Sequence, residues 1–211
     1  MFRFSNNVFK VSYFISAMLP TYSLFLLIVL TSHIDKFGFQ FENIYNFTMQ
    51  KFLLLFSIVL LISGTICLFI IKQKLRKIID SSKTKVEREV ELTSVVNPGL
   101  REFLLGILVP TVSTFSLSDS PVTAIVSFLF FNVILFLFYG QSSDFFPNLG
   151  LFLFGYSLIE GILDGRKILV FVQSKEIKHV LNSKQKVVFM GTGSPTKEIV
   201  GVYLEKNDGD K

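Results

Sequence analysis

The sequence is dominated by long apolar runs that carry no charged residue. Such runs cover residues 11–31, 52–71 and 122–139, and a fourth, at 100–118, reaches a similar length with two charged residues near its start. A helix needs about 20 largely apolar residues to cross a bilayer, within a range of about 17 to 25. The sequence therefore predicts a membrane protein with a bundle of four transmembrane helices.

The first run has an alternative interpretation as a cleaved signal peptide. Two basic residues precede it, as in a signal peptide, but the apolar stretch is long, contains Pro20, and is followed by no small-x-small cleavage pattern. We therefore favour a retained helix. Because proline removes a backbone donor and crowds the preceding turn, we expect kinks at Pro20 and at Pro110 in the third helix.

Small and polar residues interrupt the predicted helices. Small residues let membrane helices approach closely, and hydroxyl or amide groups can form hydrogen bonds across the contact. We assign this role, either packing within the bundle or contact between subunits, to Gly64, Gly106, Pro110, Thr114 and Asn132. The alternative is that some of these residues line a pore.

Lys and Arg are distributed unevenly among the segments between the runs. Residues 72–101 carry eight of them, nine follow Tyr139, and the loop at 32–50 carries one. Short loops on the cytoplasmic side of a membrane are enriched in Lys and Arg. All basic segments lie on one side if both termini are cytoplasmic, so we predict a multi-pass protein of a bacterial inner membrane in that orientation.

The segments outside the membrane have the periodicity of strands. In residues 85–95 (KVEREVELTSV), apolar or long side chains alternate with acidic ones, as in a half-buried strand. Residues 1–83 are then an N-terminal hairpin with a basic connector, and 84–147 hold the connector strand and a second hairpin. Residues 148–211 form a cytoplasmic β module.

The tail predicts the remaining strands of this module. Residues 152–163 are mostly apolar, and Asp164-Gly165 predicts a type I′ hairpin turn before a strand at 168–172. A short helical segment at 177–181 precedes a last strand pair at 187–190 and 199–204. With the strand at 86–95, these make a small five-stranded sheet or partly closed barrel that joins the connector to the tail.

Residues for catalysis or for cofactor binding are scarce. One Cys and two His exclude a disulfide framework and leave no basis for a metal site, and we find no nucleophile–base constellation. The Gly-rich loop at 191–196 lacks the Gly-Lys-Ser/Thr ending of a phosphate-binding loop. We expect no enzyme activity and no cofactor. The basic connector lacks interleaved aromatic residues, so we expect it to meet anionic lipid rather than nucleic acid.

A sheet edge offers unpaired backbone groups to a partner strand or loop. We therefore expect a partner-binding surface in the 164–206 region, and we assign it to Lys184, Lys186, Lys197 and Glu198.

Two tracts around the second hairpin carry a family resemblance. Residues 91–105 (ELTSVVNPGLREFLL) run from a strand pattern into the third helix, and residues 146–156 (FPNLGLFLFGY) lead from the fourth helix into the tail. In this order, around a short hairpin turn, they resemble the KwaA family, the membrane component of the two-gene Kiwa anti-phage defence system of bacteria.

The resemblance implies a homo-oligomer, a tetramer of four-helix subunits, in the inner membrane. It further implies a sensor that detects phage infection at the membrane and binds a cytoplasmic effector, KwaB, which acts on phage DNA. A second hypothesis, drawn from the small size and the polar residues of the helices, is a small oligomeric channel or holin-like pore.

Overall fold

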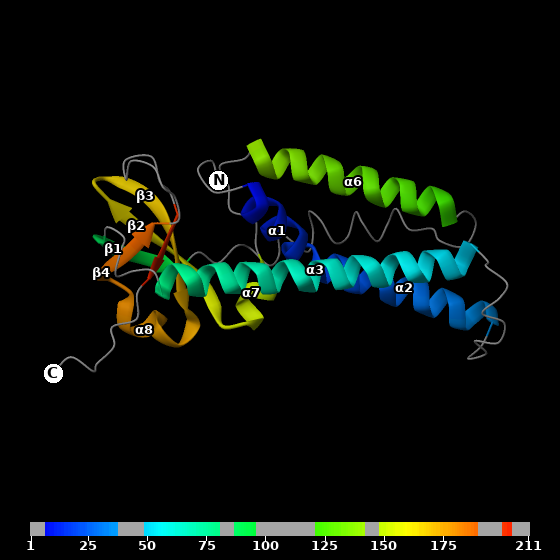
Figure 1. Cartoon of the computed structure of the whole chain (residues 1–211), viewed down its shortest axis with the longest axis horizontal. Helices are drawn as coiled ribbons and strands as arrows, with labels where there is room; N and C mark the ends of the chain where they lie inside the picture. The colour runs from blue at the N-terminus through cyan, green and yellow to red at the C-terminus, as the bar shows by residue number, and fades with distance from the viewer. Residues whose placement is uncertain are drawn as a thin grey trace. The chain divides into compact units, whose positions relative to one another are not determined.

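The computed structural model describes residues 7–37, 49–80, 87–95, 121–141, 148–189 and 200–203 (Figure 1). The chain divides into two compact units. The first unit combines Met1–Tyr13, Leu68–Asn97 and Asn148–Lys211, and contains all of the strands among the described residues. The second combines Phe14–Cys67 with Pro98–Pro147, and its described residues are helical.

The strands of the first unit form a closed barrel. Its order is β1-β2-β3-β5-β4, and every neighbouring pair is antiparallel except β3 and β5, which are parallel. The strands are β1 (Glu87–Val95), β2 (Tyr156–Leu163), β3 (Arg166–Gln173), β4 (Ser183–Phe189) and β5 (Val200–Tyr203). The prediction of a five-stranded module that joins the connector to the tail is confirmed, and the module is a barrel.

The alternating pattern of β1 places its apolar residues inside the barrel. Val90 and Leu92 are completely buried, whereas Glu87, Glu89 and Glu91 are exposed. Successive side chains of a strand point to opposite faces, so the pattern puts the acidic residues on the outer face. The core also receives Ile159, Ile168, Val170, Val172, Val180, Val187, Phe189 and Tyr203.

The predicted turn between β2 and β3 is also confirmed. Asp164 and Gly165 have φ values of 50° and 74°, the left-handed pair that a type I′ turn requires. Gly161 of β2 has a different role. A Cβ atom at this position would lie 2.6 Å from Cγ1 of Val90, so the close approach of β1 requires glycine.

Residues 152–163, whose apolar composition predicts one strand, are divided between two elements. A short helix, α7 (Leu149–Leu153), comes first, and β2 begins only at Tyr156. Asn148 caps α7, because its Oδ1 accepts a hydrogen bond from the backbone N–H of Leu151 at 3.0 Å. Gly155, at φ 78°, ends the helical turn in the left-handed region and leads the chain into the strand.

The N-terminal apolar run forms two helices, α1 (Asn7–Ala17) and α2 (Leu19–Phe37), bent by 43°. The break lies at Met18, two residues before Pro20, which occupies the first turn of α2. A proline is tolerated in the first turn of a helix but not in its interior, so the kink expected from Pro20 appears as a new helix start.

The second apolar run belongs to α3 (Met49–Asp80), a continuous helix of 32 residues. It extends beyond the predicted 52–71 through the basic residues that follow Ile71. The fourth run is α6 (Pro121–Gln141), as predicted. The third predicted helix, at 100–118, lies outside the described residues, and so do Gly106, Pro110 and Thr114.

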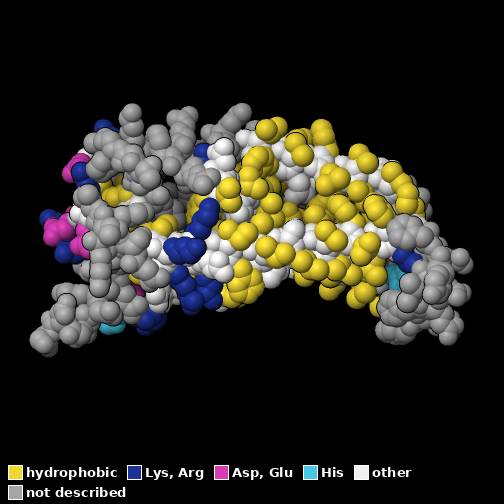
Figure 2. All heavy atoms as spheres, viewed as in Figure 1, with side chains coloured by type: hydrophobic (Ala, Val, Ile, Leu, Met, Phe, Trp, Pro, Cys, Tyr) yellow, Lys and Arg dark blue, Asp and Glu magenta, His cyan; other side chains and the backbone are white. Residues whose placement is uncertain are grey.

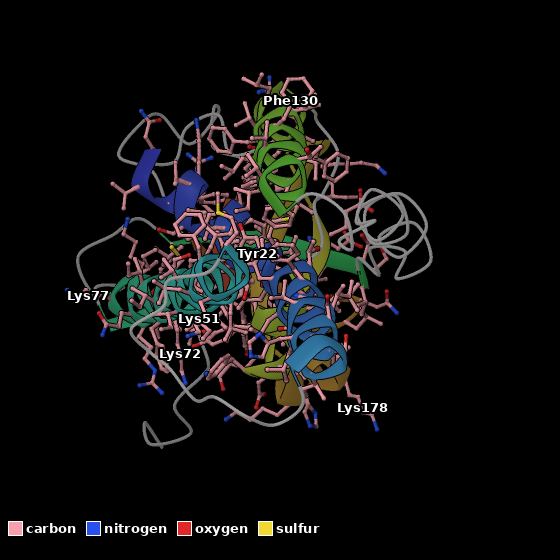
Figure 3. All side chains as sticks on the ribbon, turned by 90° about the vertical axis from the view of Figure 1, so that its right-hand side faces the viewer. Tyr22, Lys51, Lys72, Lys77, Phe130 and Lys178 are labelled. Carbon is pink, nitrogen blue, oxygen red and sulfur yellow. The ribbon has the colours of Figure 1, made fainter. Side chains whose placement is uncertain are left out.

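Aromatic contacts hold the helical unit together. Phe25 stacks on Phe128 of α6 with ring centroids 4.8 Å apart, and it meets Phe56 of α3 edge to face at 6.4 Å. Tyr22 points toward the centre of these helices, whereas Phe130 points away from it (Figure 3).

Hydrophobic side chains cover much of the face of the described helices that Figure 2 shows. Large hydrophobic side chains are exposed on these helices, among them Leu27, Val59, Ile62, Val126, Phe130 and Leu137. Among the described residues, one helix, at 51–79, is long and apolar enough to cross a membrane, or two such spans are present if α1 and α2 count as one. One or two candidate spans do not show the predicted bundle of four transmembrane helices.

Candidate functional site

The candidate partner-binding lysines lie on the outer face of β4. Lys184 and Lys186 are exposed, and in the antiparallel register with β1 they stand opposite Glu91 and Glu89. Nζ of Lys186 is 3.2 Å from Oε2 of Glu87. The barrel therefore carries a band of alternating charge along β1 and β4. Lys197 and Glu198, the other two candidates, lie outside the described residues.

Strand β4 pairs with β1 over Ser183–Val188 and with β5 over Val187–Phe189. Where a strand has a neighbour on both sides, its backbone groups are used and it offers no free edge to a partner. At Val187 and Val188 a partner would therefore meet side chains rather than a strand edge. Docking of a partner on the candidate lysines stays a prediction.

A second charged contact lies on the neighbouring strands. Nζ of Lys167 is 2.9 Å from Oε1 of Glu160, and the Ser94 hydroxyl donates to Oε2 of Glu160 at 3.3 Å. The hydrogen bond from Lys167 lowers the pKa of Glu160. Glu160 therefore stays ionised at neutral pH, and β2 adds a fixed negative charge to the outer face.

Asn148 links three segments of the first unit. Besides capping α7, it is buried and donates from Nδ2 to the backbone carbonyl of Tyr13 at 3.4 Å. The Tyr13 ring lies edge-on to Phe171 of β3, with centroids 6.4 Å apart. Gly150 of α7 packs closely against Leu68 of α3: a Cβ atom on Gly150 would lie 3.0 Å from Cδ2 of Leu68. The Asn148 side chain thus connects α1 to α7, the helix that precedes the strand β2.

We expect Asn148→Ala to lower the free energy of unfolding of the first unit by about 1 kcal/mol, the usual loss for an N-cap. The measurement is thermal unfolding of the full chain in mild detergent, followed by circular dichroism. Asn148→Ser is the control, because a Ser hydroxyl can still accept from the backbone N–H of Leu151 but is too short to donate to Tyr13, and it adds no charge. A Ser variant that is as unstable as the Ala variant would contradict the capping role.

The helix-packing candidates that the structure describes have different surroundings. Gly64 of α3 faces Leu19 and Tyr22, and a Cβ on it would lie 2.8 Å from Cδ2 of Leu19. Asn132 of α6 donates from Nδ2 to the Phe128 carbonyl of its own helix at 2.8 Å. Its Oδ1 is buried and has no partner among the described residues.

The described residues show no cluster of three or more His, Cys, Asp or Glu side chains that could hold a metal ion. Cys67 lies in α3 and is half-buried.

Sequence reasoning missed the surroundings of Lys72, at the point where α3 turns from apolar to basic. Its Nζ lies 4.6 Å from the centroid of the Phe154 ring, which follows α7. The one sequence signal for this contact is the aromatic-rich tract at residues 152–154, whose composition predicts a strand rather than the end of a helix.

The comparisons with known proteins give one family. The model of the family described as "Anti-phage protein KwaA" matches residues 9–193. No curated protein and no solved structure matches the chain. The match extends from the first helix through the β4 strand and covers most of the chain, and it confirms the resemblance seen at residues 91–105 and 146–156. The chain belongs to the KwaA family of anti-phage proteins.

Proposed function

We propose that this anti-phage protein is a non-enzymatic sensor and scaffold of the bacterial inner membrane. Its helices would detect a disturbance of the membrane during infection, and its barrel would bind a cytoplasmic effector, as the family resemblance implies. The observation that carries the proposal is the continuity of α3 (Met49–Asp80), which passes from an apolar segment into a basic one that belongs to the barrel unit.

The exposed surface of the helices supports membrane insertion. Leu27, Val59 and Phe130 are each more than half exposed. Contiguous apolar surface of this kind is unfavourable in water and favourable in hydrocarbon. The basic residues that follow Ile71 favour the cytoplasmic side for the barrel, in line with the positive-inside rule. A multi-pass topology with both termini in the cytoplasm is part of the proposal.

The connectivity of the barrel supports a sensing role. β1 and β2 are hydrogen-bonded neighbours, with Val95 opposite Ile159. The chain between them contains α6 and the predicted third span, residues 100–118. A movement of these segments in the membrane would therefore act directly on the β1–β2 ladder. Such a ladder is a direct mechanical link between membrane and cytoplasm.

The outer face of the barrel supports partner binding. Its band of alternating charge, formed by the glutamates of β1 and the lysines of β4, can select a partner of complementary charge pattern. A KwaB-like effector is the partner that the family resemblance implies. Assembly into a homo-oligomer, a tetramer by the same resemblance, would bring several such bands together.

We expect Lys184→Glu with Lys186→Glu to abolish co-purification of the effector and to reduce protection against phage. Like charges placed across an interface cost several kcal/mol, so the affinity should fall by about tenfold or more. The measurements are affinity co-purification of a co-expressed KwaB-like effector, and plaque counts on cells that carry both genes.

The matched control is Lys175→Glu with Lys178→Glu, which reverses the same number of exposed lysines elsewhere on the same unit. Circular dichroism must show that both pairs of variants remain folded. Equal loss of binding in the two pairs, or no loss in the first, would contradict a partner site on β4.

A further inference from the structure

A cavity of about 500 Å³ opens in the barrel unit beside the basic end of α3. Lys72 and Arg76 line one side, and Phe154, Tyr156 and Gln173 line another. Lys72 and Arg76 are four residues apart, so they lie one turn apart on the same face of the helix. Among the described residues that line the cavity, none is acidic.

The lining of this cavity suits an anion. Two cations point to one space, and the Lys72 ammonium is held over the Phe154 ring at 4.6 Å. A phosphate can accept a bidentate contact from a guanidinium and a further contact from an ammonium. Tyr156 and Gln173 add polar groups at the barrel side.

The surroundings of the cavity are apolar. Leu153 of α7 is 84% exposed and Phe152 is 61% exposed. On α3, Phe69 comes one turn before Lys72 and meets the Phe154 ring at a centroid distance of 5.8 Å. Figure 2 shows Lys and Arg side chains gathered over this end of α3, next to a continuous field of hydrophobic side chains.

We propose that this cavity is a binding site for the headgroup phosphate of an anionic phospholipid. Lys72 and Arg76 would bind the phosphate, and the exposed side chains of Phe69, Phe152 and Leu153 would contact the acyl chains. Basic residues beside exposed apolar ones are typical of protein surfaces at the boundary between headgroups and acyl chains. A free phosphate or a nucleotide would leave the apolar border without a partner, so a lipid fits better. The inference rests on the proposed insertion in the membrane.

The test is binding of dioleoylphosphatidylglycerol to the full chain, purified in neutral detergent and measured by native mass spectrometry. Lys72→Gln with Arg76→Gln should weaken this binding by about tenfold or more, the effect of losing two charge-assisted contacts. Dioleoylphosphatidylcholine, whose choline cation offsets its phosphate charge, should bind more weakly to the unaltered chain and should lose less affinity on these substitutions.

The matched control is Lys74→Gln with Lys77→Gln, on the same helix and with the same loss of charge. Neither residue lines the cavity, and Figure 3 shows Lys72 and Lys77 projecting from different sides of α3. An equal loss in the two pairs would mean general attraction between charges, and would overturn the site. So would competition by glycerol phosphate, without acyl chains, at the same concentration as the lipid.

Co-purification of the effector is measured on the same proteins, so that the two proposals can fail separately. Lipid binding that depends on Lys72 and Arg76, in a chain that does not bind the effector, contradicts the proposed scaffold role only. Effector binding in a chain whose lipid binding is unaffected by the two substitutions contradicts the lipid site only.

Discussion

Val170→Asp is expected to unfold the barrel and to abolish protection against phage. Val170 lies in the middle of β3, is completely buried, and belongs to the apolar core of the barrel. An unpaired charge in such a place costs about 3–5 kcal/mol. The total free energy of unfolding of a domain is about 5–15 kcal/mol, so this single substitution removes a large share of it.

Trypsin digestion of the full chain in mild detergent measures the effect, because the barrel contains many lysines that are protected only while it is folded. The matched control is Ile162→Asp on β2, which places the same carboxylate at an exposed position opposite Lys167. This variant should resist trypsin as well as the unaltered chain. Equal sensitivity of the two variants would show that position 170 is not a core position.

The strands were predictable where their local signals are strong. Residues 86–93 alternate between apolar or long side chains and polar ones, and Asp164-Gly165 can adopt the two positive φ values of a tight turn at little cost. These signals involve only neighbours along the chain, so the sequence alone carries them. They were sufficient to place β1 beside the tail strands, although 60 residues separate β1 from β2.

Closure of the barrel was not predictable in the same way. It depends on the parallel pairing of β3 with β5, in which Val170 stands opposite Gly201. A Cβ atom on Gly201 would collide with Val187 of β4, so the pairing requires glycine at this position. A glycine in a strand signals a close approach but does not name the neighbour, so the sequence left open whether the sheet closes.

The candidate partner site was predicted in part. The sequence identifies Lys184 and Lys186 as exposed lysines on a strand, and the structure places both on the outer face opposite glutamates of β1. The sequence does not reveal that β4 pairs with both β1 and β5 at Val187 and Val188, where it leaves no free edge. The cavity beside Lys72 was not predictable, because Phe154 reaches it from the end of the short helix α7. The composition of residues 152–154 predicts a strand there, whereas the structure has a helix capped by Asn148.

The second large effect is expected from Gly64→Leu, which should destabilise the packing of α2 against α3. Even a Cβ at position 64 would lie 2.8 Å from Cδ2 of Leu19, and an isobutyl group needs far more space. Overpacking of this kind usually costs about 1–3 kcal/mol. In a membrane, close packing replaces the hydrophobic effect as the force between helices, so the loss cannot be recovered by burial elsewhere.

A rescue by a smaller neighbour distinguishes this contact from a general effect of bulk in α3. Gly64→Leu should lower the melting temperature of the purified full chain, and adding Leu19→Ala should restore part of the loss, because it removes the atoms that the new side chain meets first. Ile66→Phe is the control, since this residue is 54% exposed on the same helix and has room for a larger side chain. If Leu19→Ala makes the Gly64→Leu variant still less stable, or if Ile66→Phe costs as much as Gly64→Leu, then contact between α2 and α3 does not explain the need for glycine at this position.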